Sequence, residues 1–268
     1  MLACVVNVSE GRDRSVLAAL AAAAGDALLD IHDDPFHHRA VFTLGGPEVQ
    51  QAVRRLVASA VRLVDLRRHQ GAHPRFGAVD VVPFVPLTGT PFIEALAARD
   101  AFAGWAAATL DLPCFLYGPD RTLPEIRRSA FSSLAPDRGP ATPHPGAGAV
   151  AVGARRPLVA YNLWLPAGVG VERAKATARA IRGPQLRALG FDLGGQAQVS
   201  CNLIEPAETG PAAAYDAAAA LVPVERAELV GLLPAAVLAA VPPDRWAELD
   251  LSADRTIEAR LTQAGFEG

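Results

Sequence analysis

Apolar residues along the chain fall into short runs separated by polar or Gly- and Pro-containing breaks, and each run predicts one strand or helix. In the first half, the β-branched run Leu2–Val8 predicts a buried strand, and the Ala- and Leu-rich segment Ser15–Ala24 predicts a helix. From Pro47 to Asp65, apolar residues recur at helical spacing with arginines between them, which indicates an amphipathic helix. Further strands are predicted at Ala27–Ile31, Ala40–Leu44, Ala78–Leu87 and Pro113–Tyr117, and further helices at Pro91–Leu110 and Leu123–Phe131.

The proline and glycine content changes the structure that we predict for two segments. Because a proline cannot donate to a ladder, Pro83 and Pro86 are expected to keep parts of Ala78–Leu87 out of a central strand position. The stretch Ala135–Gly153 holds four Gly and four Pro, so we expect a long loop or linker there rather than regular structure.

The pattern restarts after this stretch. Strands are predicted at Pro157–Leu165, Leu186–Leu193, Gln196–Glu205 and within Val222–Leu232, helices at Val171–Ile181 and Pro211–Leu221, and a mostly helical tail at Pro234–Phe266. Each half is therefore approximately βαββαβ, the order of a split-βαβ, ferredoxin-like unit. The predicted fold class is α+β, with two such subdomains whose sheets carry helices on one face.

Composition narrows the class of protein. The chain has 268 residues, 51% of them hydrophobic, and a net charge of −3, which disfavours general nucleic-acid binding. Lys175 is the single lysine among 25 basic residues, a bias that we ascribe mainly to a GC-rich genome. Nearly every fixed positive charge is thus a guanidinium, the group better suited to bidentate binding of carboxylates.

Cellular location is predicted from three absences in the sequence. The three cysteines form no CxxC motif or disulfide framework, and the N-terminus lacks the basic region of a signal peptide. The longest apolar stretch, Leu229–Val241, contains Pro234 and is shorter than a membrane span. We therefore expect a soluble protein of the cytoplasm.

Candidate chemistry concentrates between residues 32 and 73, which contain five of the six histidines. His73 precedes Pro74 and is bracketed by Gly71 and Gly77, so it lies on a stiff loop that a ligand can approach closely. A histidine so placed suits a general base, although a turn histidine bonded to backbone fits the same spacing. Arg75 could clamp a carboxylate with its two parallel donors.

The segment before it allows two interpretations. His32, Asp34, His37 and His38 are metal-ligand types, but no recognised ligand spacing is present, and adjacent strand residues point to opposite faces. We therefore predict no metal site and favour a substrate-binding edge at which Arg39 binds an anion. The low-bulk loop Gly139–Gly148 could hold a flat heterocycle, or it could be a hinge between the two halves.

Taken in order, several motifs make the chain resemble the formiminotransferase family. These motifs are Asn7-Val8-Ser9-Glu10-Gly11-Arg12, Leu28-Leu29-Asp30, His37-His38-Arg39, the block from His69 to Pro86, Phe115-Leu116-Tyr117, Gly139-Pro140, Gly153-Ala154-Arg155, Ala160-Tyr161-Asn162 and Gln198-Val199-Ser200-Cys201-Asn202-Leu203. The resemblance covers nearly the whole chain, and the block from His69 to Pro86 is its most specific part.

The resemblance implies a glutamate formimidoyltransferase of histidine degradation and one-carbon metabolism, which uses tetrahydrofolate as co-substrate. It implies an N-terminal subdomain at residues 1–156 with catalytic His73, a C-terminal subdomain at residues 157–268, and a homodimer. Arg39, Arg75 and His38 are expected at the substrate, and Arg182 is a further candidate for a carboxylate. The implied folate-binding residues are Gly139, Pro140, Ala141, Thr142, Pro143, His144, Pro145, Gly146, Ala147 and Gly148, with Ala180, Ile181 and Arg182 as a second stretch.

The chain also departs from the family. Ala72 stands where members usually carry a Glu before the catalytic histidine, and His38 stands where they often have an Asn. We expect no cyclodeaminase domain within 268 residues. These departures leave open another folate reaction, such as 5-formyltetrahydrofolate cyclo-ligation, or folate binding without catalysis. A metal hydrolase built on the first histidine segment is the third alternative.

Overall fold

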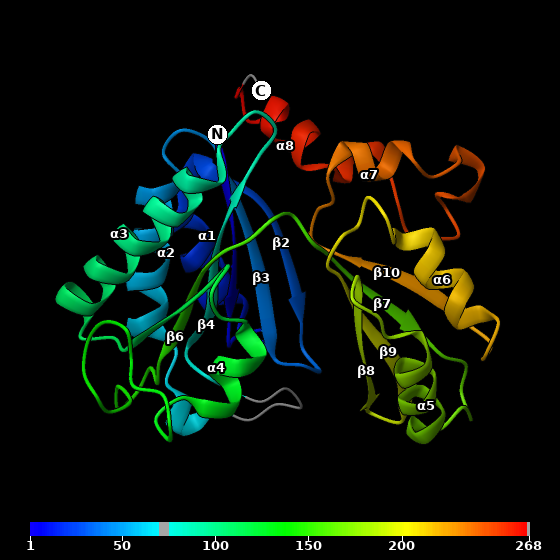
Figure 1. The fold of residues 1–268 in the computed structure, drawn as a ribbon, viewed down its shortest axis with the longest axis horizontal. Coiled ribbons are helices and arrows are strands. Elements are labelled where there is room, and N and C mark those ends of the chain that lie inside the picture. The colour runs from blue at the N-terminus through cyan, green and yellow to red at the C-terminus, as the bar shows by residue number, and fades with distance from the viewer. Residues whose placement is uncertain (70–74, 267–268) are drawn as a thin grey trace. The chain divides into compact units, whose positions relative to one another are not determined.

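The computed structural model describes residues 1–69 and 75–266 and divides the chain into two compact units. The first unit spans Met1–Arg156, and the second begins at Pro157. Both units combine a sheet with helices (Figure 1), so the predicted α+β class is confirmed. Among the described residues, none of the helices combines the length and the apolar character that crossing a bilayer requires.

The first unit contains a six-stranded sheet in the order β2-β3-β1-β4-β6-β5. Its strands are β1 (Leu2–Val8), β2 (Leu28–Asp34), β3 (Arg39–Gly45), β4 (Val79–Pro86), β5 (Cys114–Tyr117) and β6 (Val150–Ala154). Its helices are α1 (Arg14–Ala24), α2 (Val49–Leu63), α3 (Phe92–Leu110) and α4 (Leu123–Ser129). The first four strands pair antiparallel in the split-βαβ order, and β6 and β5 extend that sheet through parallel pairing on the free side of β4.

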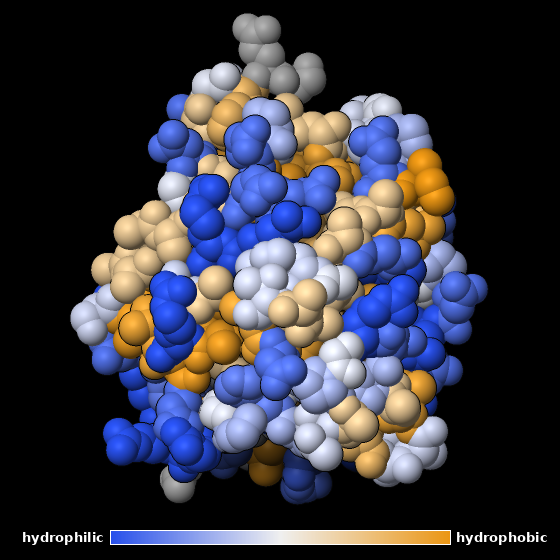
Figure 2. Space-filling model, turned by 90° about the vertical axis from the view of Figure 1, so that its left-hand side faces the viewer, coloured by the Kyte–Doolittle hydropathy of each residue, from blue (hydrophilic) through white to orange (hydrophobic). Residues whose placement is uncertain are grey.

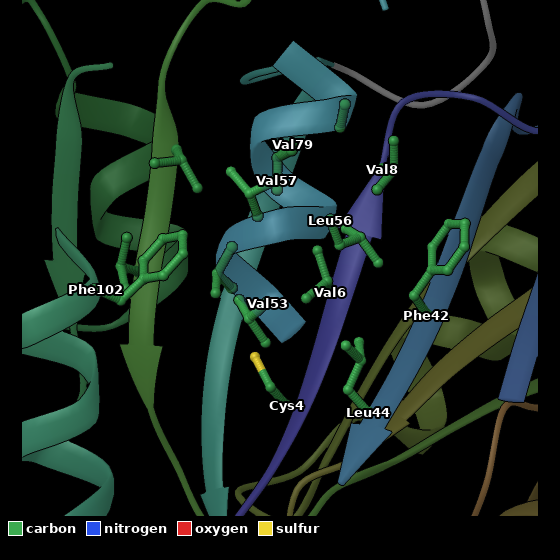
Figure 3. Packing of buried hydrophobic residues seen from close by; sticks show 14 of the residues in the cluster. Cys4, Val6, Val8, Phe42, Leu44, Val53, Leu56, Val57, Val79 and Phe102 are labelled. Atoms are coloured by element: carbon green, nitrogen blue, oxygen red, sulfur yellow. The ribbon is translucent and has the colours of Figure 1, made fainter. Parts of the chain in front are cut away.

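The core of this unit forms where one face of the sheet meets the helices. Alternate residues of β1, Cys4, Val6 and Val8, are fully buried, and they point toward α2 (Figure 3). Leu56 and Val57 of α2 are fully buried on the facing side (Figure 3). Removing a side chain of this size from water stabilises a fold by about 1.5–3 kcal/mol. This packing fixes β1, and with it the turn that follows Val8.

The opposite face of the sheet has a smaller cluster of its own. Phe115 of β5 and Val81 of β4 pack there with Ile126 of α4. The helix α4 begins with a capping box formed by Thr122 and Glu125. In it, Glu125 Oε2 accepts a hydrogen bond from the backbone amide of Thr122. The side of the molecule seen in Figure 2 carries interspersed hydrophilic and hydrophobic patches.

Of two expectations about proline- and glycine-rich strands, one is confirmed in part and one is wrong. First, β4 is a central strand, because it pairs with β1 on one side and with β6 on the other. Pro83 has no recorded partner on β1, as expected, whereas Pro86 is paired with Leu2. Second, the stretch Ala135–Gly153 is not all loop, since β6 begins at Val150. Gly153 is needed there because a Cβ would lie 2.1 Å from the ring of Tyr117.

The second unit has a four-stranded antiparallel sheet in the order β10-β7-β9-β8. Its elements are β7 (Val159–Trp164), α5 (Val171–Ile181), β8 (Leu186–Leu193), β9 (Gln196–Leu203), α6 (Pro211–Ala219) and β10 (Arg226–Val230). The tail folds into α7 (Ala235–Ala239), two 3-10 turns and α8 (Ile257–Gln263), so it is helical only in short pieces. The strand order is again that of a split-βαβ unit.

Candidate functional site

The candidate site of the first unit lies where the β2–β3 hairpin, the β1–α1 turn and the segment before β4 meet. The hairpin turn is built by Asp34, whose Oδ1 accepts hydrogen bonds from Phe36 N and His37 N, each at 2.8 Å. Asp34 is also the strand partner of Arg39, at the end of the two strands that the turn closes. Because this carboxylate already caps the turn, it is poorly placed to serve the metal hydrolase that we considered.

His38 occupies the last position of that turn with φ at 50°. This left-handed conformation is tolerated by few residues, and Asn and His are both enriched in it. The departure from the family at His38 therefore keeps the backbone geometry while replacing an amide with an imidazole. The half-buried side chain reaches the β1–α1 turn, where Gly11 N lies 3.1 Å from its Nδ1.

The β1–α1 turn is organised by Glu10. Its Oε1 accepts hydrogen bonds from the backbone amides of Gly11, Arg12 and Asp13 at 2.8–3.0 Å. Gly11 packs directly on the hairpin, since a Cβ there would lie 2.4 Å from Asp34 O. The turn and the hairpin thus form one rigid wall of the site.

Arg75 joins this wall to the segment that leads into β4. Its guanidinium donates to His37 O at 2.6 Å and to His38 O at 3.3 Å. Its Nε donates to His69 Nδ1 at 3.1 Å. The rings of His38 and His69 stack with their centroids 3.8 Å apart. Arg75 therefore braces the hairpin and orients the stacked imidazoles.

Both stacked histidines favour the neutral form. Burial lowers the pKa of His69 to about 4, and the charges of His38 and Arg75 act in the same direction. Burial also lowers the pKa of His38, although the Glu10 carboxylate opposes the shift. At pH 7 the two rings are therefore uncharged, and the fixed positive charge of the site comes from guanidinium groups.

One carboxylate balances several of these guanidinium groups. The side chain of Asp80 is 4% exposed and forms an ion pair with Arg127 of α4. Its charge also acts on Arg39 and Arg75, where it opposes the lowering of their pKa by burial. Arg39 forms no side-chain hydrogen bond within residues 1–69 and 75–266, so its donors remain available for an anion.

The loop Gly139–Gly148 is folded back on itself by His144. Its Nδ1 accepts hydrogen bonds from Gly146 N at 3.2 Å and Ala147 N at 2.9 Å. The backbones of His144 and Gly148 also exchange two hydrogen bonds of 2.8 Å. The end of the loop, residues 144–148, is thus a compact turn that its own hydrogen bonds hold together.

This turn is attached to both flanks of the segment that contains His73. On one side, Leu66 N donates to Gly146 O at 2.9 Å, and on the other, Ala78 N donates to Ala147 O at 2.9 Å. Gly77 permits the contact, because a Cβ there would lie 1.8 Å from Ala149 O. Two segments about 70 residues apart in the sequence therefore lie side by side.

Of the other predicted site residues, His73 lies outside the described residues, as does Ala72. Ala180 and Ile181 end α5 in the second unit, and Arg182 follows them with its Nε donating to Ala188 O at 2.6 Å. The assignments of residues to folate and substrate stay predictions.

Sequence reasoning did not single out Glu10, His69, Asp80 or Arg127 as functional. Glu10, His69 and Asp80 lie within the motifs that carry the family resemblance, so that signal could have drawn attention to them. For Arg127 no signal exists, because its partner is 47 positions away in the sequence.

Glu10, His38 and His69 have ligand atoms within 4.8 Å of one another, a spacing that could hold a metal ion. The hydrogen bond from Arg75 to His69 argues against a metal ion at this position. A metal on His69 Nδ1 would displace the guanidinium, and a metal on Nε2 would need Nδ1 to carry the proton that faces this donor. The arrangement is therefore better suited to hydrogen bonding with an anionic organic ligand.

Comparisons with known proteins agree with this chemistry. Residues 1–155 match the model of the formiminotransferase domain, N-terminal subdomain. The chain is 35% identical to glutamate formimidoyltransferase of Streptococcus pyogenes serotype M1, over 88% of this chain and 89% of that protein. It is 33% identical to glutamate formimidoyltransferase of Thermoplasma acidophilum, over 87% and 88%. It is 32% identical to formimidoyltransferase-cyclodeaminase of Sus scrofa, over 87% of this chain and 50% of that protein.

Proposed function

The chain belongs to the formiminotransferase family, as its motifs suggested, and we propose that it is a glutamate formimidoyltransferase. It transfers the formimino group of N-formimino-L-glutamate to N5 of tetrahydrofolate. The names of the two relatives matched along most of their length support this activity, and the family implies a folate as the acceptor.

The chemistry needs one group that moves a proton. N5 of the folate attacks the amidine carbon, and a C–N bond forms as the C=N π electrons move to nitrogen. The N5 proton passes to a base, and the C=N bond then re-forms from the nitrogen lone pair as the bond from carbon to the glutamate nitrogen breaks and that nitrogen takes a proton. We assign the base, and the acid that returns the proton, to His73.

One observation carries the proposal: the turn at the end of the Gly139–Gly148 loop is hydrogen-bonded, through Gly146 and Ala147, to both flanks of the segment that contains His73. In a group transfer the acceptor must lie beside the proton-moving residue, and holding two reactants in line lowers a barrier by several kcal/mol. A folate held by this turn would meet that requirement.

The residues present suit the two substrates. The turn is built from small residues and proline, so its backbone can approach a flat pterin ring closely. Both substrates carry carboxylates, and the donors of Arg39 are available to bind one. Arg75 remains a candidate for substrate contact, but its contacts with His37, His38 and His69 give it a bracing role as well.

The decisive experiment is a turnover assay of the purified chain with N-formimino-L-glutamate and tetrahydrofolate. We expect 5-formiminotetrahydrofolate and L-glutamate to appear together. Replacing His73 with Ala should lower kcat by about 10²–10⁴-fold while circular dichroism stays unchanged, and added imidazole should restore part of the rate. Folate binding without transfer, or turnover that requires a nucleotide, would contradict the proposal.

The homodimer and the cytoplasmic location implied by the resemblance stay predictions. Light scattering coupled to gel filtration tests the first. Fractionation of the source cells tests the second.

A further inference from the structure

The imidazole of His69 has one nitrogen, Nε2, that is buried and has no hydrogen-bond partner among residues 1–69 and 75–266. Buried polar atoms in native proteins are nearly always paired, because an unpaired one destabilises the folded chain. An unpaired atom at the candidate site therefore needs an explanation. Hydrogen bonding to a bound ligand is one such explanation.

The other nitrogen shows which tautomer is present. Arg75 is protonated at all relevant pH values, and its Nε donates to His69 Nδ1 at 3.1 Å. Nδ1 must therefore carry a lone pair. The low pKa of His69 makes the ring neutral, so its one proton is on Nε2. The unpaired atom is an N–H donor, and it needs an acceptor.

The surroundings select an anionic acceptor. Arg75 and Arg12 both place positive charge at His69, and Glu10 provides the one opposing negative charge found there among the described residues. The Oε1 atom of that carboxylate already accepts three backbone amides. A buried N–H in a positive environment binds a negatively charged oxygen strongly, because little water competes.

We propose that His69 Nε2–H donates a hydrogen bond to a carboxylate oxygen of the glutamate moiety of the formimino donor. Arg75 is then a positioning residue, which holds His69 in the tautomer that keeps the proton on Nε2. The identity of the ligand rests on the proposed function. The presence of an anion-binding N–H rests on the hydrogen bond from Arg75 and on the burial of Nε2, and the lowered pKa of His69 supports it.

Two variants of similar size separate this role from packing. In His69→Gln the side-chain amide nitrogen can replace Nε2–H, whereas the shorter side chain in His69→Asn reaches only the position of Nδ1. We expect His69→Gln to keep KM for N-formimino-L-glutamate within about threefold, and His69→Asn to raise it about 10–100-fold, the worth of a charge-assisted bond. KM for tetrahydrofolate should be unchanged in both. Equal effects of the two variants, or a rise confined to KM for the folate, would overturn the proposal.

Nitrogen NMR of the unmodified full chain gives a test that does not depend on turnover. With ¹⁵N-histidine labelling, His69 should show a protonated Nε2 and an unprotonated Nδ1, and saturating L-glutamate should move the Nε2 proton downfield. Replacing Arg75 with Lys should convert the signals to those of a tautomer mixture. Unchanged His69 signals in saturating L-glutamate would refute the assignment. A chain that binds L-glutamate at His69 but transfers nothing would refute only the proposed function.

Discussion

Replacing Asp80 with Asn tests the electrostatic organisation of the site most directly. The substitution keeps the size of the side chain and its ability to accept from Phe76 N. It removes the negative charge that pairs with Arg127 and acts on Arg39 and Arg75. Three guanidinium groups would then share a partly dehydrated region without a compensating carboxylate.

The expected loss follows from burial. Removing one partner of a buried ion pair costs about 3–5 kcal/mol of unfolding free energy. Here the Asp80 side chain is 4% exposed but that of Arg127 is 29% exposed, so water can partly solvate the orphaned guanidinium. We therefore expect a loss of about 3 kcal/mol, the lower end of that range, and a fall in Tm of roughly 6–12 °C.

The assay should follow the first unit alone. Trp105 packs against the core of that unit, whereas Trp164 and Trp246 belong to the second. Urea unfolding followed by Trp105 fluorescence, in a chain where the other two tryptophans are Phe, therefore reports the stability of the first unit. That Trp105-only chain with Asp80 intact is the matched reference.

A second substitution distinguishes charge from packing. If the loss comes from an uncompensated cation, adding Arg127→Met to Asp80→Asn should recover at least about 1 kcal/mol relative to additivity. A loss below about 1 kcal/mol in Asp80→Asn, or full additivity of the two changes, would refute the reasoning.

Three further outcomes follow from the same geometry. Gly77→Ala should prevent the loop contact and lower the free energy of unfolding by more than about 3 kcal/mol, because the new Cβ would overlap Ala149 O. Gly104→Ala, at an open position of α3, should instead raise it by about 1 kcal/mol. Urea titration of the two variants compares these effects. His144→Ala removes the acceptor of two loop amides and should raise KM for tetrahydrofolate several-fold with a stability change of about 1 kcal/mol, which steady-state kinetics and a melt would measure. The folded-state pKa of His69, about 4, lies below its ordinary value of 6.5, so folding stability should fall as the pH is lowered from 6.5 to 4. Denaturation measured at a series of pH values should show a flatter dependence in His69→Gln. An unchanged slope in that variant would contradict the reasoning.

Local patterns were sufficient to predict most of the fold. The boundaries of Leu2–Val8, Val171–Ile181 and Leu186–Leu193 agree with β1, α5 and β8, because periodic apolar residues and a breaking Gly or Pro are both local signals. The position of β4 and the existence of β6 depended on partners far away in the chain. Pro83 is tolerated in a central strand because its neighbours pair, and Gly153 is a strand residue because a tyrosine ring covers it.

The segments that form the candidate site were predictable from the sequence, but the contacts between their side chains were not. The histidine-rich hairpin and the segment before β4 stood out by composition, and both lie at the site. Composition could not show that Arg75 turns toward backbone carbonyls and an imidazole, since the same guanidinium fits a carboxylate equally well. Nor could it pair Asp80 with Arg127, because ion pairs between distant elements follow from packing and leave no spacing in the sequence.

The balance of charges explains how an acidic chain can bind acidic substrates. The net charge is −3, yet around the stacked histidines Glu10 directs its Oε1 to backbone amides, and Asp80 is shared among three guanidinium groups. The neutral imidazoles of His38 and His69 add hydrogen-bond donors to the site without adding charge. The guanidinium groups of the site therefore act in a partly buried region, where a carboxylate gains most from a positive charge. Arginine suits this arrangement better than lysine, because one guanidinium can brace the backbone and orient a neighbouring ring at the same time, as Arg75 does.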